Sequence, residues 1–146
     1  MNDHARFMDI AYDQALKSYR EGGLPIGSIL VRNGEVVGSG HNRRVQQSDP
    51  IAHGEMDCLR NAGRQRGYRD TVIYTTLSPC MMCSGTLVQF KIPKVVIGES
   101  VNFPGNKGFL ASRGIDVVDL NDARCIDLMA RFIREKPDLW NEDIAE

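Results

Sequence analysis

The chain has 146 residues, a size that suits one domain with a buried core. Its apolar fraction of 42% and charged fraction of 25% are ordinary for a globular protein, and no apolar stretch approaches the length of a membrane span. The formal net charge of −1 disfavours polynucleotides and acidic membranes as partners, because both attract basic proteins. We therefore expect no nucleic-acid and no membrane partner.

The cysteines indicate a reducing compartment. Two of the four form a C-x-x-C motif, which favours a metal or redox role over a disulfide framework. The first residues are polar and lack the basic and apolar stretches of a secretory signal. We find no repeat, low-complexity tract or linker. The sequence thus predicts a single domain over residues 1–146 and a cytoplasmic location.

The N-terminal part is expected to form a helix and a hairpin. Apolar residues recur with helical spacing over 7–19, and Gly22-Gly23 suits the end of that helix. Strands at 26–31 and 36–40 flank Asn33-Gly34, a dipeptide that favours tight hairpins. The sheet is therefore expected to open with an antiparallel pair.

The rest of the chain is expected to alternate helices and strands. Ser78 and Pro79 suit the N-cap and first residue of an apolar helix that ends at Phe90. Pro137 should end the last helix and leave a short tail. The other expected elements are a polar loop at 42–50, helices at 53–64 and 122–136, strands at 71–76, 94–98 and 115–120, and a loop with one short helix at 101–114. This order predicts an α/β fold with three layers, α/β/α, around a five-stranded mixed sheet.

Two short motifs, His53-Gly54-Glu55 and Pro79-Cys80-Met81-Met82-Cys83, contain the chemistry. One imidazole and two thiolates make three zinc-type ligands, and zinc with three protein ligands keeps a position open for water. Both motifs fall at expected helix starts, where free N–H groups stabilise thiolates. Glu55 lacks the spacing of a second ligand on the same helix, so we expect it beside the water. We predict one catalytic zinc held by His53, Cys80 and Cys83.

Two other interpretations of the motifs are less favoured. A structural zinc site would need a fourth protein ligand. Cys58 lies about 140° around the helix from His53, Cys125 falls on an apolar stripe, and neither His4 nor His41 has ligand-like spacing. A redox C-x-x-C motif would leave His53-Gly54-Glu55 unexplained.

The paired motifs match the H-x-E…P-C-x-x-C signature of zinc-dependent base deaminases. The chain resembles the cytidine deaminase-like superfamily and, more specifically, the cytosine deaminases of the yeast type. The resemblance runs almost from end to end. It rests on the two motifs and on the stretches Met8-Asp9-Ile10-Ala11-Tyr12, Glu21-Gly22-Gly23-Leu24-Pro25-Ile26-Gly27, Gly40-His41-Asn42, Tyr74-Thr75-Thr76-Leu77-Ser78-Pro79-Cys80, Val101-Asn102-Phe103 and Trp140-Asn141-Glu142-Asp143-Ile144.

The resemblance implies hydrolytic deamination of free cytosine to uracil with release of ammonia, as in pyrimidine salvage, by a homodimer with one Zn²⁺ per chain. It assigns Glu55 as the proton shuttle and the tail at 137–146 as the part that closes the site and selects a free base. The implied substrate contacts are Asn42 at the O2 and N1 edge, the N–H of Gly54 at O2, the carbonyl of Ser78 and carboxylate of Asp143 at the amine, and walls formed by Phe103, Trp140, Ile26 and Leu77.

Other functions stay open at this stage. The run Ser48-Asp49-Pro50-Ile51-Ala52 departs from the yeast-type pattern, which keeps isocytosine, and less readily guanine, as alternative bases. A tRNA or DNA deaminase shares the zinc core, although it would need a basic groove. A non-catalytic binding protein on the same fold is disfavoured because Glu55 and all three ligands are present.

Overall fold

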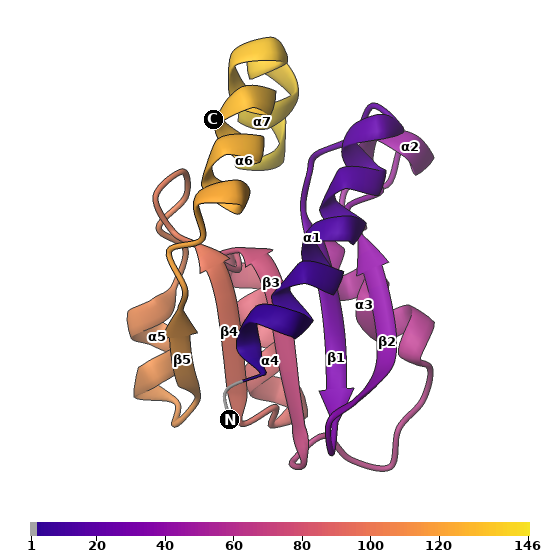
Figure 1. Cartoon of the computed structure of the whole chain (residues 1–146), viewed down its shortest axis with the longest axis vertical. Helices are drawn as coiled ribbons and strands as arrows, with labels where there is room; N and C mark the ends of the chain where they lie inside the picture. The colour runs from indigo at the N-terminus through magenta and orange to yellow at the C-terminus, as the bar shows by residue number, and fades with distance from the viewer. Residues whose placement is uncertain (1–2) are drawn as a thin grey trace.

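A computed structural model describes residues 3–146 as one five-stranded sheet with helices on both faces (Figure 1). The strands are β1 (Gly27–Arg32), β2 (Glu35–His41), β3 (Thr71–Leu77), β4 (Lys94–Glu99) and β5 (Asp116–Asp119). The helices are α1 (His4–Arg20), α2 (Arg44–Gln47), α3 (Gly54–Ala62), α4 (Met81–Phe90), α5 (Lys107–Ser112), α6 (Ala123–Glu135) and α7 (Pro137–Asp143). None of these helices is long and apolar enough to cross a bilayer.

The sheet is mixed, as the sequence predicts, with the order β2-β1-β3-β4-β5. Strand β1 is antiparallel to both of its neighbours, whereas β3, β4 and β5 run parallel to one another. Asn33 and Gly34 have positive φ angles of 52° and 79°, as a tight hairpin between β1 and β2 requires. The hairpin prediction is therefore confirmed.

Alternating side chains of the strands build two apolar layers. Ile29 and Val31 of β1 pack with α1 and α6, whereas Leu30 between them packs with α3, α4 and α5 on the opposite face. This alternation is the period-two pattern of a strand buried on both faces. The predicted three-layer α/β/α architecture is confirmed.

A third apolar cluster lies at one end of the sheet. It joins Ile26 before β1 and Leu77 at the end of β3 to Phe132 of α6 and Trp140 of α7. The carboxyl ends of β3 and β4 meet here, and the open end of an α/β sheet is where ligands usually bind. The fold thus brings the ends of several elements to one place without a long loop.

The helix that follows β3 begins later than predicted. Cys80, not Ser78, is the N-cap residue, and its sulfur accepts a hydrogen bond from the Cys83 N–H at 3.5 Å. The Ser78 N–H instead bonds the Glu99 carbonyl at 2.9 Å, which prolongs the pairing of β3 with β4. A thiolate can replace the usual hydroxyl or carboxylate cap, and residue-type preferences do not anticipate this substitution.

Two further segments are helical where irregular structure is expected. The loop at 42–50 contains α2, which is too short for a periodic pattern to reveal it. Pro137 does end α6, but it also begins α7, because proline suits the first turn of a helix. The predicted tail is therefore a second helix, and it holds Trp140 in the apolar cluster.

Close packing of α1 against β1 predicts that Gly27→Ala lowers the free energy of unfolding by about 1–3 kcal/mol or more. A Cβ at Gly27 would overlap the backbone of Ala11 and Ala15. Gly67→Ala is the matched control, since open space surrounds that position, and it should change stability by less than about 0.5 kcal/mol. Urea denaturation measures both values, and equal stability of the two variants would contradict this packing argument.

Candidate active site

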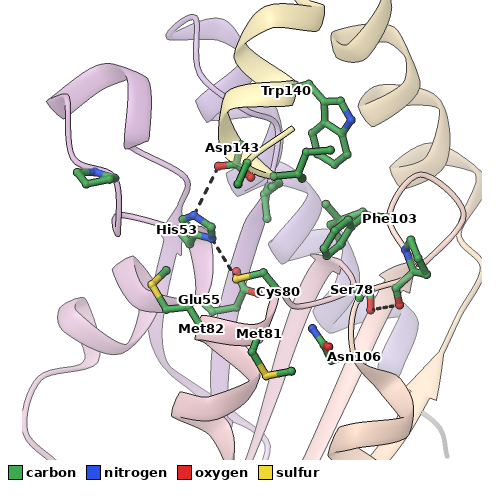
Figure 2. Close-up of a pocket in the computed structure, with 17 residues that line it drawn as sticks. His53, Glu55, Ser78, Cys80, Met81, Met82, Phe103, Asn106, Trp140 and Asp143 are labelled. Carbon is green, nitrogen blue, oxygen red and sulfur yellow. Dashed lines mark hydrogen bonds and ion pairs between the residues drawn. The ribbon is translucent and has the colours of Figure 1, made fainter.

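A cavity of about 470 Å³ opens at this end of the sheet (Figure 2). Most of the residues predicted for the site line it, and they come from separate parts of the chain. Those predicted residues are Ile26, His53, Glu55, Leu77, Ser78, Cys80, Phe103, Trp140 and Asp143. The wall is largely apolar, and its polar groups gather beside the N-termini of α3 and α4.

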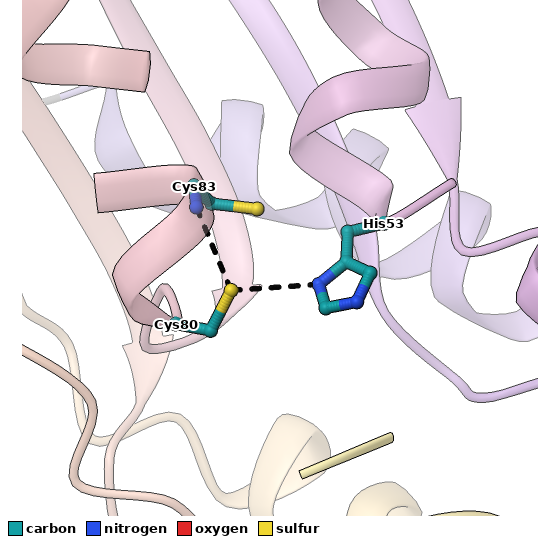
Figure 3. A group of neighbouring side chains, drawn as sticks. All are labelled: His53, Cys80 and Cys83. Carbon is teal, nitrogen blue, oxygen red and sulfur yellow. Dashed lines mark hydrogen bonds between the residues drawn. The ribbon is translucent and has the colours of Figure 1, made fainter. Parts of the chain in front are cut away.

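The predicted zinc ligands are together at these two helix starts (Figure 3). One ligand atom each from His53, Cys80 and Cys83 lies within 4.8 Å of the others. The Cys80 Sγ to His53 Nδ1 distance is 3.6 Å, and ordinary zinc bond lengths at a tetrahedral angle place sulfur and nitrogen about 3.6 Å apart. These residues therefore fit zinc, and Cys58 and Cys125 lie instead in the apolar core.

The protonation of the two thiols differs in a way that suits metal binding. The Cys83 thiol donates to Cys80 and the helix start adds a backbone N–H, and these bonds lower the pKa of Cys80 to about 4 against the opposing effect of burial. The same contact and burial raise the pKa of Cys83. A thiolate is the form that ligates zinc, so Cys80 is ready to bind at neutral pH.

His53 lies between a thiolate and a carboxylate. Its Nδ1 faces Cys80, and its Nε2 is 3.5 Å from Asp143 Oδ1. Burial alone would lower the pKa of His53, but the neighbouring Cys80, Asp143 and Glu55 raise it to about 9. A carboxylate on the second ring nitrogen is the usual partner of a metal-binding histidine, because it fixes the orientation of the ring.

Glu55 lies in the first turn of α3 and is 4% exposed. Burial, with a further contribution from the Cys80 thiolate, raises the pKa of Glu55 to about 7. It is not among the clustered ligand atoms, which agrees with the expectation that it does not hold the metal. A carboxyl group with this pKa can both accept and donate a proton near neutral pH.

Two of the predicted substrate contacts, Asn42 and Gly54, do not line the cavity. Asn42 is fully buried, and its Oδ1 accepts the Arg44 N–H at 2.9 Å, so part of its amide closes the turn into α2. Its Nδ2 and Asp143 Oδ1 are buried atoms without a hydrogen bond in residues 3–146. Burial raises the pKa of Asp143, against the opposing effects of His53, Arg44 and the Asn42 amide.

Two buried carboxylates that the motifs do not reveal hold the loops of the site. Asp57 accepts the His41 N–H and the Arg43 Nε, both at 3.0 Å, and so fixes the segment around Asn42. Glu99 accepts the Val101 and Asn102 N–H groups at 2.7 and 3.0 Å and so fixes the loop before Phe103. Acidic residues in a sequence are read as exposed by default, and their burial depends on the tertiary structure.

The family model for the zinc-binding region of cytidine and deoxycytidylate deaminases matches residues 1–99. This match contains both motifs and two thirds of the chain. The chain belongs to the cytidine and deoxycytidylate deaminase family. The three clustered ligands thus belong to a zinc-binding deaminase domain, and the catalytic interpretation of the C-x-x-C motif is preferred to the redox one.

Similar proteins extend over different shares of the chain. A cytosine deaminase of Candida albicans is 54% identical over 147 aligned residues, covering 99% of this chain and 98% of its own. A tRNA-specific adenosine deaminase of Buchnera aphidicola is 40% identical over 102 residues, 68% of each chain. Among solved structures, a guanine deaminase from Nitrosomonas europaea has a TM-score of 0.74 at 21% identity. The match covers 86% of the present chain and 82% of the guanine deaminase, and it shows a likeness of fold alone.

The ligand geometry predicts that Cys83→Ala lowers the zinc content of this deaminase well below one ion per chain, because two remaining ligands hold zinc poorly. Cys125→Ala is the matched control, since it also removes a buried thiol but one that lies in the core. Elemental analysis after dialysis gives the ratio of zinc to protein. Equal zinc in both variants would place the metal elsewhere.

Proposed function

We propose that the chain catalyses the hydrolysis of free cytosine to uracil and ammonia. One observation carries the proposal. The helix α7 supplies Trp140 and Asp143 to the cavity but lies outside the zinc-binding region at 1–99. The similarity to the Candida albicans cytosine deaminase covers 99% of this chain and therefore extends into α7, whereas the similarity to the tRNA deaminase of Buchnera covers 68%.

Two buried polar atoms near the cavity suit the edge of a cytosine ring. Asn42 Nδ2 is a donor and Asp143 Oδ1 is an acceptor, and neither makes a hydrogen bond in residues 3–146, although His53 and Arg44 form ion pairs with the Asp143 carboxylate. Cytosine offers a carbonyl oxygen as acceptor and an exocyclic amine as donor. A carboxylate accepts from an amine and repels a carbonyl oxygen, so Asp143 would favour the substrate over uracil at that position.

The proton transfers would run through Glu55. Its carboxylate accepts a proton from water and passes it to ring nitrogen N3, which makes C4 electrophilic. Oxygen from water then bonds to C4. Glu55 next takes the proton of the new C4 hydroxyl and delivers it to the exocyclic amine, and the C4–N bond breaks as the C4 carbonyl of uracil forms and ammonia leaves. Each transfer leaves Glu55 in the state that the next one requires, and a pKa near neutrality suits both directions.

The other residues would bind and shield the base. Zinc held by His53, Cys80 and Cys83 would supply a Lewis acid that makes water nucleophilic near neutral pH. The N–H of Gly54 and the carbonyl of Ser78 remain proposed contacts to O2 and the amine. The apolar walls, Ile26, Leu77, Phe103 and Trp140, would exclude bulk water from the ring.

A reducing, cytoplasmic site of action is part of the proposal. All four cysteines are free thiols, and Cys58 and Cys125 are buried ones. A reducing compartment preserves both these thiols and the unoxidised C-x-x-C pair that zinc requires.

We predict that the purified zinc-loaded protein releases ammonia from cytosine but not from cytidine, because the similarity to a cytosine deaminase extends into α7. Isocytosine, guanine and adenine complete the panel, with and without a chelator. Turnover of cytosine that the chelator abolishes supports the proposal. Faster turnover of cytidine, isocytosine or guanine would refute the assignment of the base.

Glu55→Gln is the control for this assay. It keeps the shape of the buried side chain and removes the proton shuttle, so turnover of cytosine should fall by about 10²–10⁴-fold or more. The variant should retain its zinc, since Glu55 is not a clustered ligand. Near-normal turnover with zinc bound would show that another group transfers the proton.

We further propose that the protein is a homodimer that pairs through α4. Two large apolar side chains on this helix, Met81 and Phe90, are 54% and 39% exposed, which is unusual for a helix that also contributes to the core. Met81 and Gly85 lie about one turn apart on the same side of α4, and the Cβ position of Gly85 faces open space, whereas Phe90 lies on the opposite side of the helix. The side of α4 with Met81 and Gly85 is therefore the face that a second copy would cover.

The dimer proposal predicts a solution mass of about twice 16.3 kDa by light scattering. Gly85→Arg should lower the mass to that of one chain, because it places a charge in the apolar interface. Gly108→Arg on α5 is the matched control, as it also points into open space and should leave the mass unchanged. A monomeric native protein would contradict the proposal.

A further inference from the structure

We propose that Arg44 is a positioning residue that fastens α7 over the cavity and orients Asp143. Arg44 lies on α2, outside both zinc motifs, and its guanidinium forms ion pairs with Glu142 and with Asp143. The inference rests on the proposed function for its effect on turnover, but its effect on α7 can be measured without any substrate.

The two ends of α7 are held in different ways. Trp140 is 6% exposed and packs edge-on against Phe103, with 6.2 Å between the ring centroids. From Asn141 onward no apolar side chain is fully buried, although Ile144 packs partly against the same cluster, and Asp143, Ile144 and Ala145 line the cavity. Apolar packing therefore secures the Trp140 side more firmly than the part that covers the cavity.

Arg44 provides a second attachment from a fixed position. Its backbone N–H is bonded to Asn42 Oδ1, and the preceding residue, Arg43, is paired through Nε with the buried carboxylate of Asp57 on α3. The start of α2 is thus tied to the helix that carries His53 and Glu55. The Arg44 side chain extends from this turn to α7. It therefore helps to fix where α7 lies relative to the zinc ligands.

Few basic residues of the described chain form ion pairs with α7. In residues 3–146, the acidic groups of α7 form ion pairs with only two basic residues, His53 and Arg44. Arg44 is 19% exposed and lies between Glu142, which is 56% exposed, and Asp143, which is 7% exposed. The guanidinium therefore joins the solvent side of α7 to the carboxylate that faces His53.

The expected contribution to overall stability is small, because Glu142 is largely exposed and such pairs contribute little to folding. The local consequence is larger. Asp143 Oδ1 has no hydrogen bond in the described chain, so its direction depends mainly on the two cations beside it. Without Arg44, only His53 and the Asn42 amide would orient this carboxylate, and α7 would lose both of its ion pairs to α2 in residues 3–146.

Acrylamide quenching of Trp140 fluorescence tests the proposal directly, because Trp140 is the only tryptophan of the chain. Arg44→Gln and Glu142→Gln should both increase quenching, and Arg44→Gln the more so, since it removes both ion pairs. The double variant should be no more quenched than Arg44→Gln. Arg44→Lys should restore part of the protection. The control is Arg60→Gln, because Arg60 is an exposed arginine of α3 that forms no ion pair in residues 3–146.

Steady-state kinetics with cytosine give the second readout. Arg44→Gln should raise KM several-fold and lower kcat, whereas Glu142→Gln should mainly raise KM, because Asp143 keeps its contact with Arg44. Unchanged quenching of Trp140 in Arg44→Gln and Glu142→Gln would overturn the proposal. If Arg44→Gln fails to fold, the quenching of Trp140 in Glu142→Gln decides the test, because Glu142 is exposed and its substitution should not disturb folding. Absence of cytosine turnover in the native protein would refute the proposed function and leave the quenching test intact.

Discussion

The site depends on the meeting of two helix starts across the end of the sheet. His53 is the N-cap residue of α3 and Cys80 is the N-cap residue of α4, and their ligand atoms are 3.6 Å apart. Capping residues have extended backbone, which turns their side chains away from the helix axis and toward each other. The unpaired N–H groups of both first turns then favour the negative charge of the thiolates. One geometric arrangement thus positions the ligands and lowers the pKa of Cys80.

The pair formed by His53 and Cys80 affects the charge of the two carboxyl groups nearest to it, Glu55 and Asp143. Glu55 is buried beside a thiolate and therefore holds a proton more tightly than an exposed glutamate. Asp143 approaches from α7 and pairs with the outer nitrogen of His53. The carboxyl groups of Glu55 and Asp143, the Cys80 thiolate and the His53 imidazole lie close together in a largely apolar environment. A divalent cation would balance the negative charge of this group electrostatically.

The sequence determines most of the fold and the metal ligands, because both depend on local patterns. Residue spacing predicts the sheet, the hairpin at Asn33-Gly34 and the cluster of His53, Cys80 and Cys83. The helical nature of residues 137–143 is not predicted, since Pro137 signals an end and a start equally well. The burial of Asp57 and Glu99 is not predictable either, because it depends on which loops fold back to them.

The position of Glu99 has a consequence for how such a site can change its substrate. This buried carboxylate holds the beginning of the loop at 100–106 through its backbone N–H groups, and the Ser78 hydroxyl donates to the Pro104 carbonyl at 3.0 Å, so the side chains between these two anchors can vary. Phe103, Pro104, Gly105 and Asn106 of this loop line the cavity, and none of them belongs to the zinc-binding region at 1–99. Mutations here can reshape the wall around a bound base while the metal chemistry stays intact.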